Sequence, residues 1–267
     1  RRKQLWCYHA AVGHITRHAA CHAGSQNYKV KVAVMQKQIV LWLGREFVFL
    51  SCEGVGMGSA ADQMEGIFAR IKTALQKENL SLDQTIRTRL WAVDRKSRDR
   101  GSDVRAQYNV GQARAATSSY IMPDRFASDA LVGLDLVALK PADTNRKKII
   151  VESVPVRTPL SYLILDSLLV LSGKTVVLPT LSEQLDEILP RITGILAEAS
   201  SNWDRVVNVS CYLHRSQTIE TLRKGFAKWI KTPMPRMEIV AVDGYSAEGK
   251  FIEIEVTADN LLRTAPI

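Results

Sequence analysis

The sequence predicts an α+β protein made of two tandem units, each a mostly antiparallel sheet with two helices on one face. The first observation is an internal repeat. The segment QMEGIFARIKTALQKENLSLDQTIRTRLWAV, which begins at Gln63, aligns without a gap with QLDEILPRITGILAEASSNWDRVVNVSCYLH, which begins at Gln184. Such self-similarity indicates repeated structural units. The aligned pairs include Ile67 with Ile188, Arg70 with Arg191, Ile71 with Ile192, Leu75 with Leu196 and Asp83 with Asp204.

The second observation is the order of hydrophobic patterns, which is the same in both copies. Apolar residues at helical spacing are followed by a short polar break and then by a β-rich run, TIRTRLWAV in the first copy and VVNVSCYLH in the second. Downstream, ARAATSSYIMPDRFASDALVGLDLVAL takes the place of PRMEIVAVDGYSAEGKFIEIEVTA. Arg114 therefore corresponds to Arg236.

Each copy is expected to contain a strand pair, a long amphipathic helix, a strand, a second helix and two final strands. Helices in this order cover one face of a sheet. Because strands such as RVVNVSCYL are apolar on both sides, the other face is expected to pack against a neighbouring unit. In the second copy the elements fall near 168–179, 183–200, 205–213, 217–230, 236–243 and 250–258. The predicted parts of the chain are a leader (1–27), a first unit (28–142) and a second unit (150–267), with the boundary near KPADTNRKK.

Composition is that of a globular protein without a membrane span. The chain has 267 residues, of which 46% are hydrophobic and 24% charged. Its longest apolar stretches, such as SYLILDSLLVL, are too short or too interrupted to cross a bilayer. The four cysteines show no paired spacing that suggests disulfides or a zinc site, which favours a reducing compartment and hence the cytoplasm.

The net charge of +9 is concentrated at the start of the chain. Residues 1–45 contain eight basic and no acidic residues, so that 36 − 8 = 28 basic residues face 27 acidic ones over the rest. A nearly neutral body argues against nucleic acid as a partner. The basic leader leaves three interpretations open: an organelle-targeting segment, a disordered arm or an artificial chain boundary.

The leader also holds four of the five histidines. If GHITRHAACHA is helical, His14, His18 and His22 share one face at a spacing that can hold a metal ion. No carboxylate lies near them to complete a hydrolytic site, and the segment lacks a strong helix-start signal. Adventitious nickel or zinc binding is the favoured interpretation, and no physiological metal or other cofactor is expected.

The last two strands carry the most informative charged residues. Arg236 opens the first of them, and in the second Ile252, Ile254 and Val256 alternate with Glu253, Glu255 and Thr257. One face is then apolar and the other acidic. From these residues alone, the favoured interpretation is a solvated acidic face with an arginine at its rim.

The order of LLVLSGK, a helix, NWDRVVNVSCYLHR, GFAKWIKTPMPRMEIVAV and KFIEIEVTA resembles the RidA/YjgF family of imine deaminases. The first copy is similar over EFVFLSCEGVG, the shared helix and QARAATSSYI, so that the resemblance covers roughly residues 46–260 as a tandem pair. It implies the family's chorismate-mutase-like fold. It also implies a trimeric assembly with sites between neighbouring units.

The resemblance implies a small carboxylated substrate and a role for each member of the pair. Arg236 would hold the substrate carboxylate through two parallel hydrogen bonds, and Glu253 would position or activate the attacking water. Glu255 would then be the outward-facing or structural acid. The further substrate-binding residues implied by position are Arg114, Ser172, Gly173 and Glu238.

Several positions depart from the family pattern. The first copy has Gly133 in place of the glutamate, so Arg114 lacks its catalytic partner, and Asp135 matches the second acid. In the second copy TPLSYLILDSLL lacks the Gly-Pro-Tyr-Ser lead-in, and Arg223 stands where an asparagine is common. Glu238 replaces a small residue or cysteine and would repel a carboxylate or shift its own pKa upward. A plain 2-iminopropanoate deaminase is therefore not favoured.

Three functions remain open. One is a hydrolase or lyase acting on a small carboxylated imine or enamine. The second is a chorismatase-like enzyme acting on a carboxylated enol ether, since chorismatases look like paired units of this fold. The third is a non-catalytic ligand-binding or interaction protein in which both sites have drifted.

Overall fold

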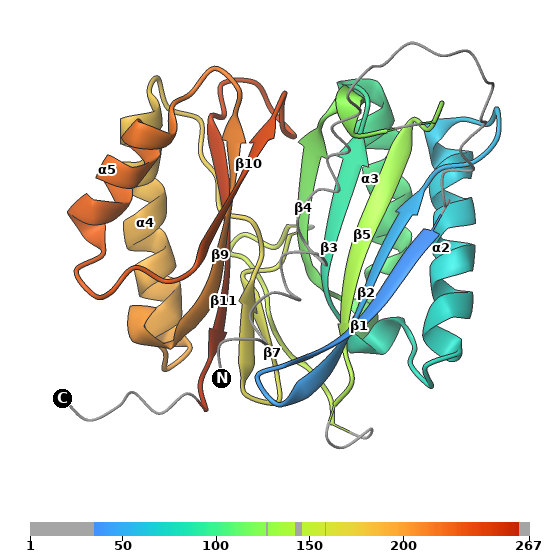
Figure 1. Cartoon of the computed structure of the whole chain (residues 1–267), viewed down its shortest axis with the longest axis horizontal. Helices are drawn as coiled ribbons and strands as arrows, with labels where there is room; N and C mark the ends of the chain where they lie inside the picture. Colours follow the sequence, from blue (N-terminus) through green and yellow to red (C-terminus); the bar gives the residue numbers. More distant parts are fainter. Residues whose placement is uncertain (1–34, 127, 142–145, 158, 262–267) are drawn as a thin grey trace, which may run out of the picture.

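The computed structural model describes residues 35–126, 128–141, 146–157 and 159–261. The predictions for the leader, including His14, His18 and His22, lie outside these residues. The chain forms two sheets that face each other, with α2 and α3 on the outside of one and α4 and α5 on the outside of the other (Figure 1). Their strand orders are β1-β2-β5-β3-β4 and β10-β9-β11-β8-β7-β6.

The first unit is a five-stranded mixed sheet with two helices. Only the β3–β4 pair is parallel, and the other neighbours are antiparallel. The elements are β1 (Met35–Trp42), β2 (Arg45–Glu53), α2 (Ala60–Gln76), β3 (Thr85–Ala92), α3 (Arg95–Tyr108), β4 (Ala116–Ile121) and β5 (Val132–Leu139).

The second unit repeats this arrangement and adds one strand. Here β9 and β10 form the parallel pair. The elements are β6 (Ile149–Val151), β7 (Tyr162–Leu165), β8 (Leu168–Leu171), α4 (Leu181–Glu198), β9 (Val206–His214), α5 (Ile219–Trp229), β10 (Met237–Val242) and β11 (Ile252–Asp259).

The strand pair predicted at 168–179 is displaced. The observed hairpin is β7–β8, with Leu163 opposite Val170, and its turn passes through Asp166 at a φ of 55°. The apolar stretch SYLILDSLLVL thus folds back on itself at Asp-Ser instead of forming one strand. After β8 the described backbone makes an isolated bridge from Lys174 to Ile254.

The repeat has a visible structural basis at the start of α2 and α4. Both helices begin with a capping box, Ser59 with Asp62 and Thr180 with Glu183. The following residue is a buried glutamine in each unit. Gln63 accepts a hydrogen bond from the Leu131 backbone at 2.8 Å. Gln184 likewise accepts one from the Phe251 backbone at 2.8 Å, so each glutamine fixes the lead-in to the last strand of its own sheet.

Apolar and aromatic side chains fill most of the space between the sheets. One cluster joins residues of β1, β2 and β5 to residues of β7 and β8, with Phe47, Phe49, Val137, Leu163, Leu168 and Val170 among its members. A second cluster is aromatic. Tyr120 of β4 stacks on Tyr212 of β9 with ring centroids 3.9 Å apart, and Trp91 of β3 lies 5.2 Å from Tyr120.

A buried ion cluster lies in the middle of this interface. Glu255 is 1% exposed and accepts hydrogen bonds from Arg89 at 2.7 Å, Ser118 at 2.6 Å and Tyr120 at 3.2 Å. Arg87 lies 3.0 Å from the same carboxylate. The acidic face of β11 is therefore neither solvated nor outward-facing, because it is covered by the sheet of the first unit.

Burial alone would raise the pKa of Glu255. The charges of Arg87 and Arg89, with hydrogen bonds from Arg89 and Ser118, instead lower it to about 2. The three charges of Glu255, Arg87 and Arg89 can be buried only because they compensate one another. A buried ion cluster of this kind adds little to the stability of the fold relative to apolar residues of similar size, but removing one member leaves the others uncompensated.

We expect Glu255→Gln to lower the free energy of unfolding by roughly 3–5 kcal/mol at pH 7. Because the folded pKa of Glu255 is depressed, this difference should be present above pH 5 and should disappear as the pH falls toward 2. Denaturant titrations at several pH values measure it. The control is Glu187→Gln, which breaks the exposed pair with Arg191 and should have a much smaller effect. Equal stability of Glu255→Gln and wild type at pH 7 would contradict the account.

Candidate active site

Glu253 lies at the junction of the two units. It projects from β11 toward the first unit and is 5% exposed. Its carboxyl rests on Gly173, where an added Cβ would lie only 1.9 Å from Oε1 of Glu253. Gly173 in turn donates a backbone hydrogen bond to the Thr117 carbonyl at 3.3 Å, and the Thr117 amide donates to Ser172 Oγ at 3.3 Å. The predicted site residues Ser172, Gly173 and Glu253 are thus brought together, against β4 of the first unit.

The pKa of Glu253 is raised to about 7. Burial is the main cause, and the negative charge of Glu255 adds to it, while Lys250, Arg105 and Arg98 act in the opposite direction. Two carboxyl groups on one face of one strand therefore differ in protonation at neutral pH. Glu255 is ionised, whereas Glu253 is close to half-protonated. Environments that push two pKa values apart in this way are typical of acid–base sites.

Aromatic and basic groups surround Glu253. The Tyr245 hydroxyl donates to the Tyr212 carbonyl at 2.8 Å, and buried Tyr120 lies on the same side. Lys250 donates to Ser246 Oγ at 2.6 Å. Lys174 donates to the Ser161 carbonyl, and burial lowers its pKa to about 8. These contacts give Glu253 a dry setting with a basic rim.

Arg236 is not placed beside Glu253 in this chain. It directly precedes β10, and its carbonyl accepts a hydrogen bond from Val209 at 2.9 Å. Glu253 pairs with Tyr212 of β9, and Tyr212 pairs with Val240 of β10. Arg236 lies four residues before Val240 along the chain. Four residues of strand span about 13 Å, and β9 separates the two strands by roughly two spacings of 4.8 Å. The two side chains thus start from positions that differ by four residues of register and by one intervening strand.

Glu238 forms a separate group with Arg236 at the edge strand β10. It accepts a hydrogen bond from Ser210 Oγ at 3.4 Å. Burial raises the pKa of Glu238, while the positive charges of Arg89 and Arg236 oppose that change. The charged groups that act on Glu238 are therefore Arg89, Glu255 and Arg236, and Glu253 is not among them.

The corresponding positions of the first copy, Arg114 and Gly133, do not form an arginine–glutamate pair. Arg114 donates to Glu152 at 2.7 Å. At Gly133 a Cβ would lie 2.9 Å from the ring of Phe126, so the phenyl group occupies the place of a side chain. Asp135 accepts hydrogen bonds from Trp91 and Arg125, both at 2.7 Å, and acts as a structural acid.

Sequence reasoning missed the basic groups of α3. Its composition is typical of a solvated charged helix, yet Arg105 is buried and donates to the Ser118 carbonyl at 2.6 Å and to Ser119 Oγ at 2.8 Å. The spacing held a signal. Ser97, Gly101, Val104 and Arg105 share one helix face, and three of these four residues are small or apolar.

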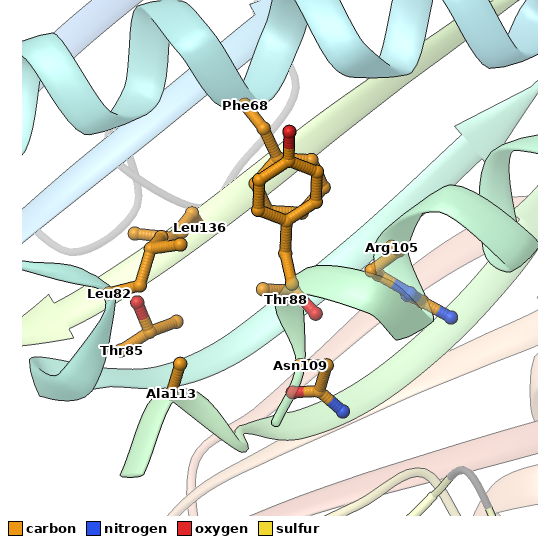
Figure 2. A pocket seen from close by; sticks show the side chains of 9 residues that line it. Phe68, Leu82, Thr85, Thr88, Arg105, Asn109, Ala113 and Leu136 are labelled. Carbon is orange, nitrogen blue, oxygen red and sulfur yellow. The ribbon is translucent and has the colours of Figure 1, made fainter. Parts of the chain in front are cut away.

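Two small cavities between the elements do not include Glu253 in their linings. One of about 10 Å³ lies between α3 and the first sheet (Figure 2). A second of about 20 Å³ lies between the sheets beside Arg87 and Arg89. Each has room for one water molecule or little more. Figure 2 shows the labelled lining of the first: Phe68, Leu82, Thr85, Thr88, Arg105, Asn109, Ala113 and Leu136.

Other site classes find little support in the described residues. No cluster of three or more His, Cys, Asp or Glu side chains there can hold a metal ion. Cys211 is a packed thiol whose pKa burial raises further, which argues against a nucleophile. Over the described part of the chain, no helix has the length and apolar content to span a bilayer.

Comparison with known proteins agrees with this architecture. Residues 159–260 match the family model Endoribonuclease L-PSP. A crystal structure of a chorismatase covers 83% of this chain and 79% of its own, with a TM-score of 0.60 at 11% identity, which is a likeness of fold. The structure of Rv2704 from Mycobacterium tuberculosis, of the YjgF/YER057c/UK114 family, covers 42% of this chain and 99% of its own, with 21% identity and a TM-score of 0.39.

A protein of Lactococcus lactis named as a regulator, AldR, is 28% identical over 80 residues, which are 30% of this chain and 63% of that relative. The family match falls on the unit that contains Glu253, and the chorismatase fold extends over both sheets. Residues 159–260, which lie in the second unit, therefore match the L-PSP family model, and the two sheets are consistent with two units of this fold in tandem.

Proposed function

We propose that this protein is a hydrolase or lyase in which Glu253 exchanges protons with a small carboxylated imine or enamine. The observation that carries the proposal is the contrast between Glu253, with a pKa raised to about 7, and Glu255, with a pKa lowered to about 2. A group with a pKa near the operating pH is present in both protonation states and serves as base and acid in turn.

In imine hydrolysis the substrate reacts as the protonated imine. Ionised Glu253 accepts a proton from water while the water oxygen bonds to the iminium carbon, which gives a neutral carbinolamine and protonated Glu253. Protonated Glu253 then returns its proton to the amine nitrogen, the carbon–nitrogen bond breaks, and the hydroxyl proton passes to the released ammonia as the carbonyl forms. The products are an oxo acid and ammonium, and the enzyme regains its starting state. Tyr120, Tyr212 and Tyr245 limit competing water around the carboxyl.

The remaining implied residues keep a place in the proposal. Arg236 and Glu238 lie at the edge strand β10 and are only partly buried. In a trimer of tandem chains this edge would face a neighbouring copy, where Arg236 would contact an anionic group. Two buried free thiols, Cys52 and Cys211, suit a reducing compartment such as the cytoplasm.

A second candidate is cleavage of a carboxylated enol ether. The likeness of fold to a chorismatase over both units favours it. Here protonated Glu253 would donate its proton to the terminal alkene carbon, and water would add to the resulting oxocarbenium carbon and return a proton to Glu253. The hemiketal would then break its bond to the ether oxygen, releasing an alcohol and an oxo acid. The non-catalytic alternative, a ligand-binding or interaction protein, predicts no turnover with either substrate class.

We expect Glu253→Gln to lower turnover by roughly 10²–10⁴-fold, because it retains the shape of the side chain and removes proton exchange. The assay is ammonia release from imines generated in place by an amino-acid oxidase, with chorismate hydrolysis in parallel. Glu187→Gln, which breaks the exposed pair with Arg191 on α4, is the control and should retain most of the activity. Equal rates for wild type and Glu253→Gln in both assays would remove the enzyme proposal and favour the binding protein.

The pH profile should distinguish the two chemistries. If Glu253 starts as a base, as in imine hydrolysis, the rate should rise with pH through about 7 and then level off. If it starts as an acid, as in enol ether cleavage, the rate should fall through the same pH. Initial rates between about pH 5 and pH 9 provide the measurement. A flat profile for both substrates would contradict a chemical role for this carboxyl.

A further inference from the structure

Helix α3 of the first unit reaches over the site of the second. Arg95 in its first turn donates to the backbone carbonyls of Tyr245 at 3.3 Å and Ser246 at 3.0 Å. Lys250 is tied to the same loop through Ser246 at 2.6 Å. The loop 243–251 between β10 and β11 is therefore held under α3, and Glu253 follows it by two residues. Groups from two different units thus converge on one place.

Arg98 follows Arg95 by one helical turn and is only partly satisfied. Its side chain is 15% exposed, and it forms an ion pair with Asp99, which is itself largely exposed. Its Nε is buried and has no hydrogen-bond partner among the described residues. A buried donor without an acceptor costs about 1–3 kcal/mol, so an acceptor at this position would be stabilising.

The charge balance around Glu253 is positive. The charges of Lys250, Arg105 and Arg98 all act on this carboxyl, yet no hydrogen bond or ion pair joins it to any of them among the described residues. The pKa of Lys250 is lowered, mainly by burial. Repulsion from the positive charges of Arg98 and Arg95 lowers it further. Arg105 is buried and bonded to Ser118 and Ser119, which leaves Arg98 and Lys250 as the two partly exposed basic groups that act on this carboxyl.

We infer that Arg98 and Lys250 hold the anionic group of the substrate beside Glu253, so that the first unit contributes to substrate recognition and the second supplies the proton chemistry. The ligand class is a small carboxylate, because one guanidinium and one ammonium match its two oxygens. Arg105 does not contact the ligand in this arrangement. It positions β4 through Ser118 and Ser119. The inference rests on the proposed function only in taking this carboxylate as part of the substrate.

The test measures pyruvate binding to the full chain by calorimetry. We expect Arg98→Gln and Lys250→Gln each to weaken binding by about tenfold or more, the usual loss for a charge-assisted hydrogen bond. Matched controls are Arg100→Gln on the same helix and Lys224→Gln on α5, both exposed in surface ion pairs, which should change affinity by less than about twofold. Thermal unfolding of each variant confirms that it is folded.

A second readout separates ligand contact from a merely structural role. Ionised Glu253 repels a bound carboxylate, so wild-type affinity should fall as the pH rises from about 6 to 8, and Glu253→Gln should weaken this dependence, leaving the part due to Lys174, whose pKa is about 8. The Arg98 and Lys250 variants should retain a pH dependence while losing affinity. The titratable and charged groups that face Glu253 are Arg98 and Arg105 of α3, Tyr120 of β4, Lys174 after β8, Tyr245 and Lys250 of the loop, and Glu255.

Two results would overturn the inference. One is unchanged affinity in Arg98→Gln and Lys250→Gln, most tellingly if Arg236→Ala abolishes binding. The other is a wild-type chain that does not bind pyruvate at either pH. Failure here is distinguishable from failure of the proposed function. If Glu253→Gln loses turnover while both basic variants bind pyruvate normally, only the anion site is wrong. If both basic variants lose affinity while Glu253→Gln retains turnover, the anion site stands and the proposed proton chemistry is wrong.

Discussion

The ion cluster of Glu255 with Arg87 and Arg89 joins the two units and sets the electrostatics of everything near it. These three charges are withdrawn from water, and each is tolerated only because the others are present. The acid comes from β11 of the second unit and both arginines from β3 of the first. The sheets must therefore meet in one register for the cluster to form. Glu253, two residues away on the same face, then experiences a permanently ionised neighbour.

The pKa values of the two glutamates differ because their buried surroundings differ. Two guanidinium groups and a serine hydroxyl stabilise ionised Glu255, and their effect on its pKa exceeds that of desolvation. Glu253 is surrounded by Gly173, aromatic rings and basic groups that do not bind it directly, so desolvation has the larger effect and raises its pKa. The glycine allows the carboxyl to lie flat against the chain after β8, and any side chain there would displace it. A reactive acid is thus produced by the same packing that produces an inert one.

The repeat, the number of units and most elements could be predicted because they depend on local periodicity and capping. Gln63 and Gln184, the first aligned pair, occupy equivalent buried positions and make equivalent backbone contacts. Glu253 could be singled out by its resemblance to a family motif. The separation of Glu253 from Arg236 could not be predicted, because β10 and β11 are adjacent in sequence but have β9 between them in the sheet. Sheet order is a long-range property that the alternation of residues does not record.

The same limit explains the other differences. The acidic face of β11 has the pattern of a solvated strand, and only the partner sheet, with arginines from more than 160 residues earlier, makes it interior. The basic residues of α3 have the composition of a surface helix, and their role depends on which loop lies beneath them. Arg105 of α3 is buried against β4 of its own unit, on a helix face whose spacing held a signal. The acids of β11 are buried by the neighbouring unit, and hydrophobic patterning within one unit contains no signal for that.

The central claim is that the junction of the two units holds Glu253 near half-protonation while Glu255 stays ionised. Carboxyl-selective ¹³C NMR of glutamate-labelled protein, with Glu253→Gln and Glu255→Gln spectra to assign the two signals, tests it directly. The account predicts that the Glu253 signal titrates at about pH 7 and that the Glu255 signal is unchanged down to the lowest pH at which the protein stays folded. A Glu253 signal that titrates below pH 5, as in a solvated glutamate, would contradict it.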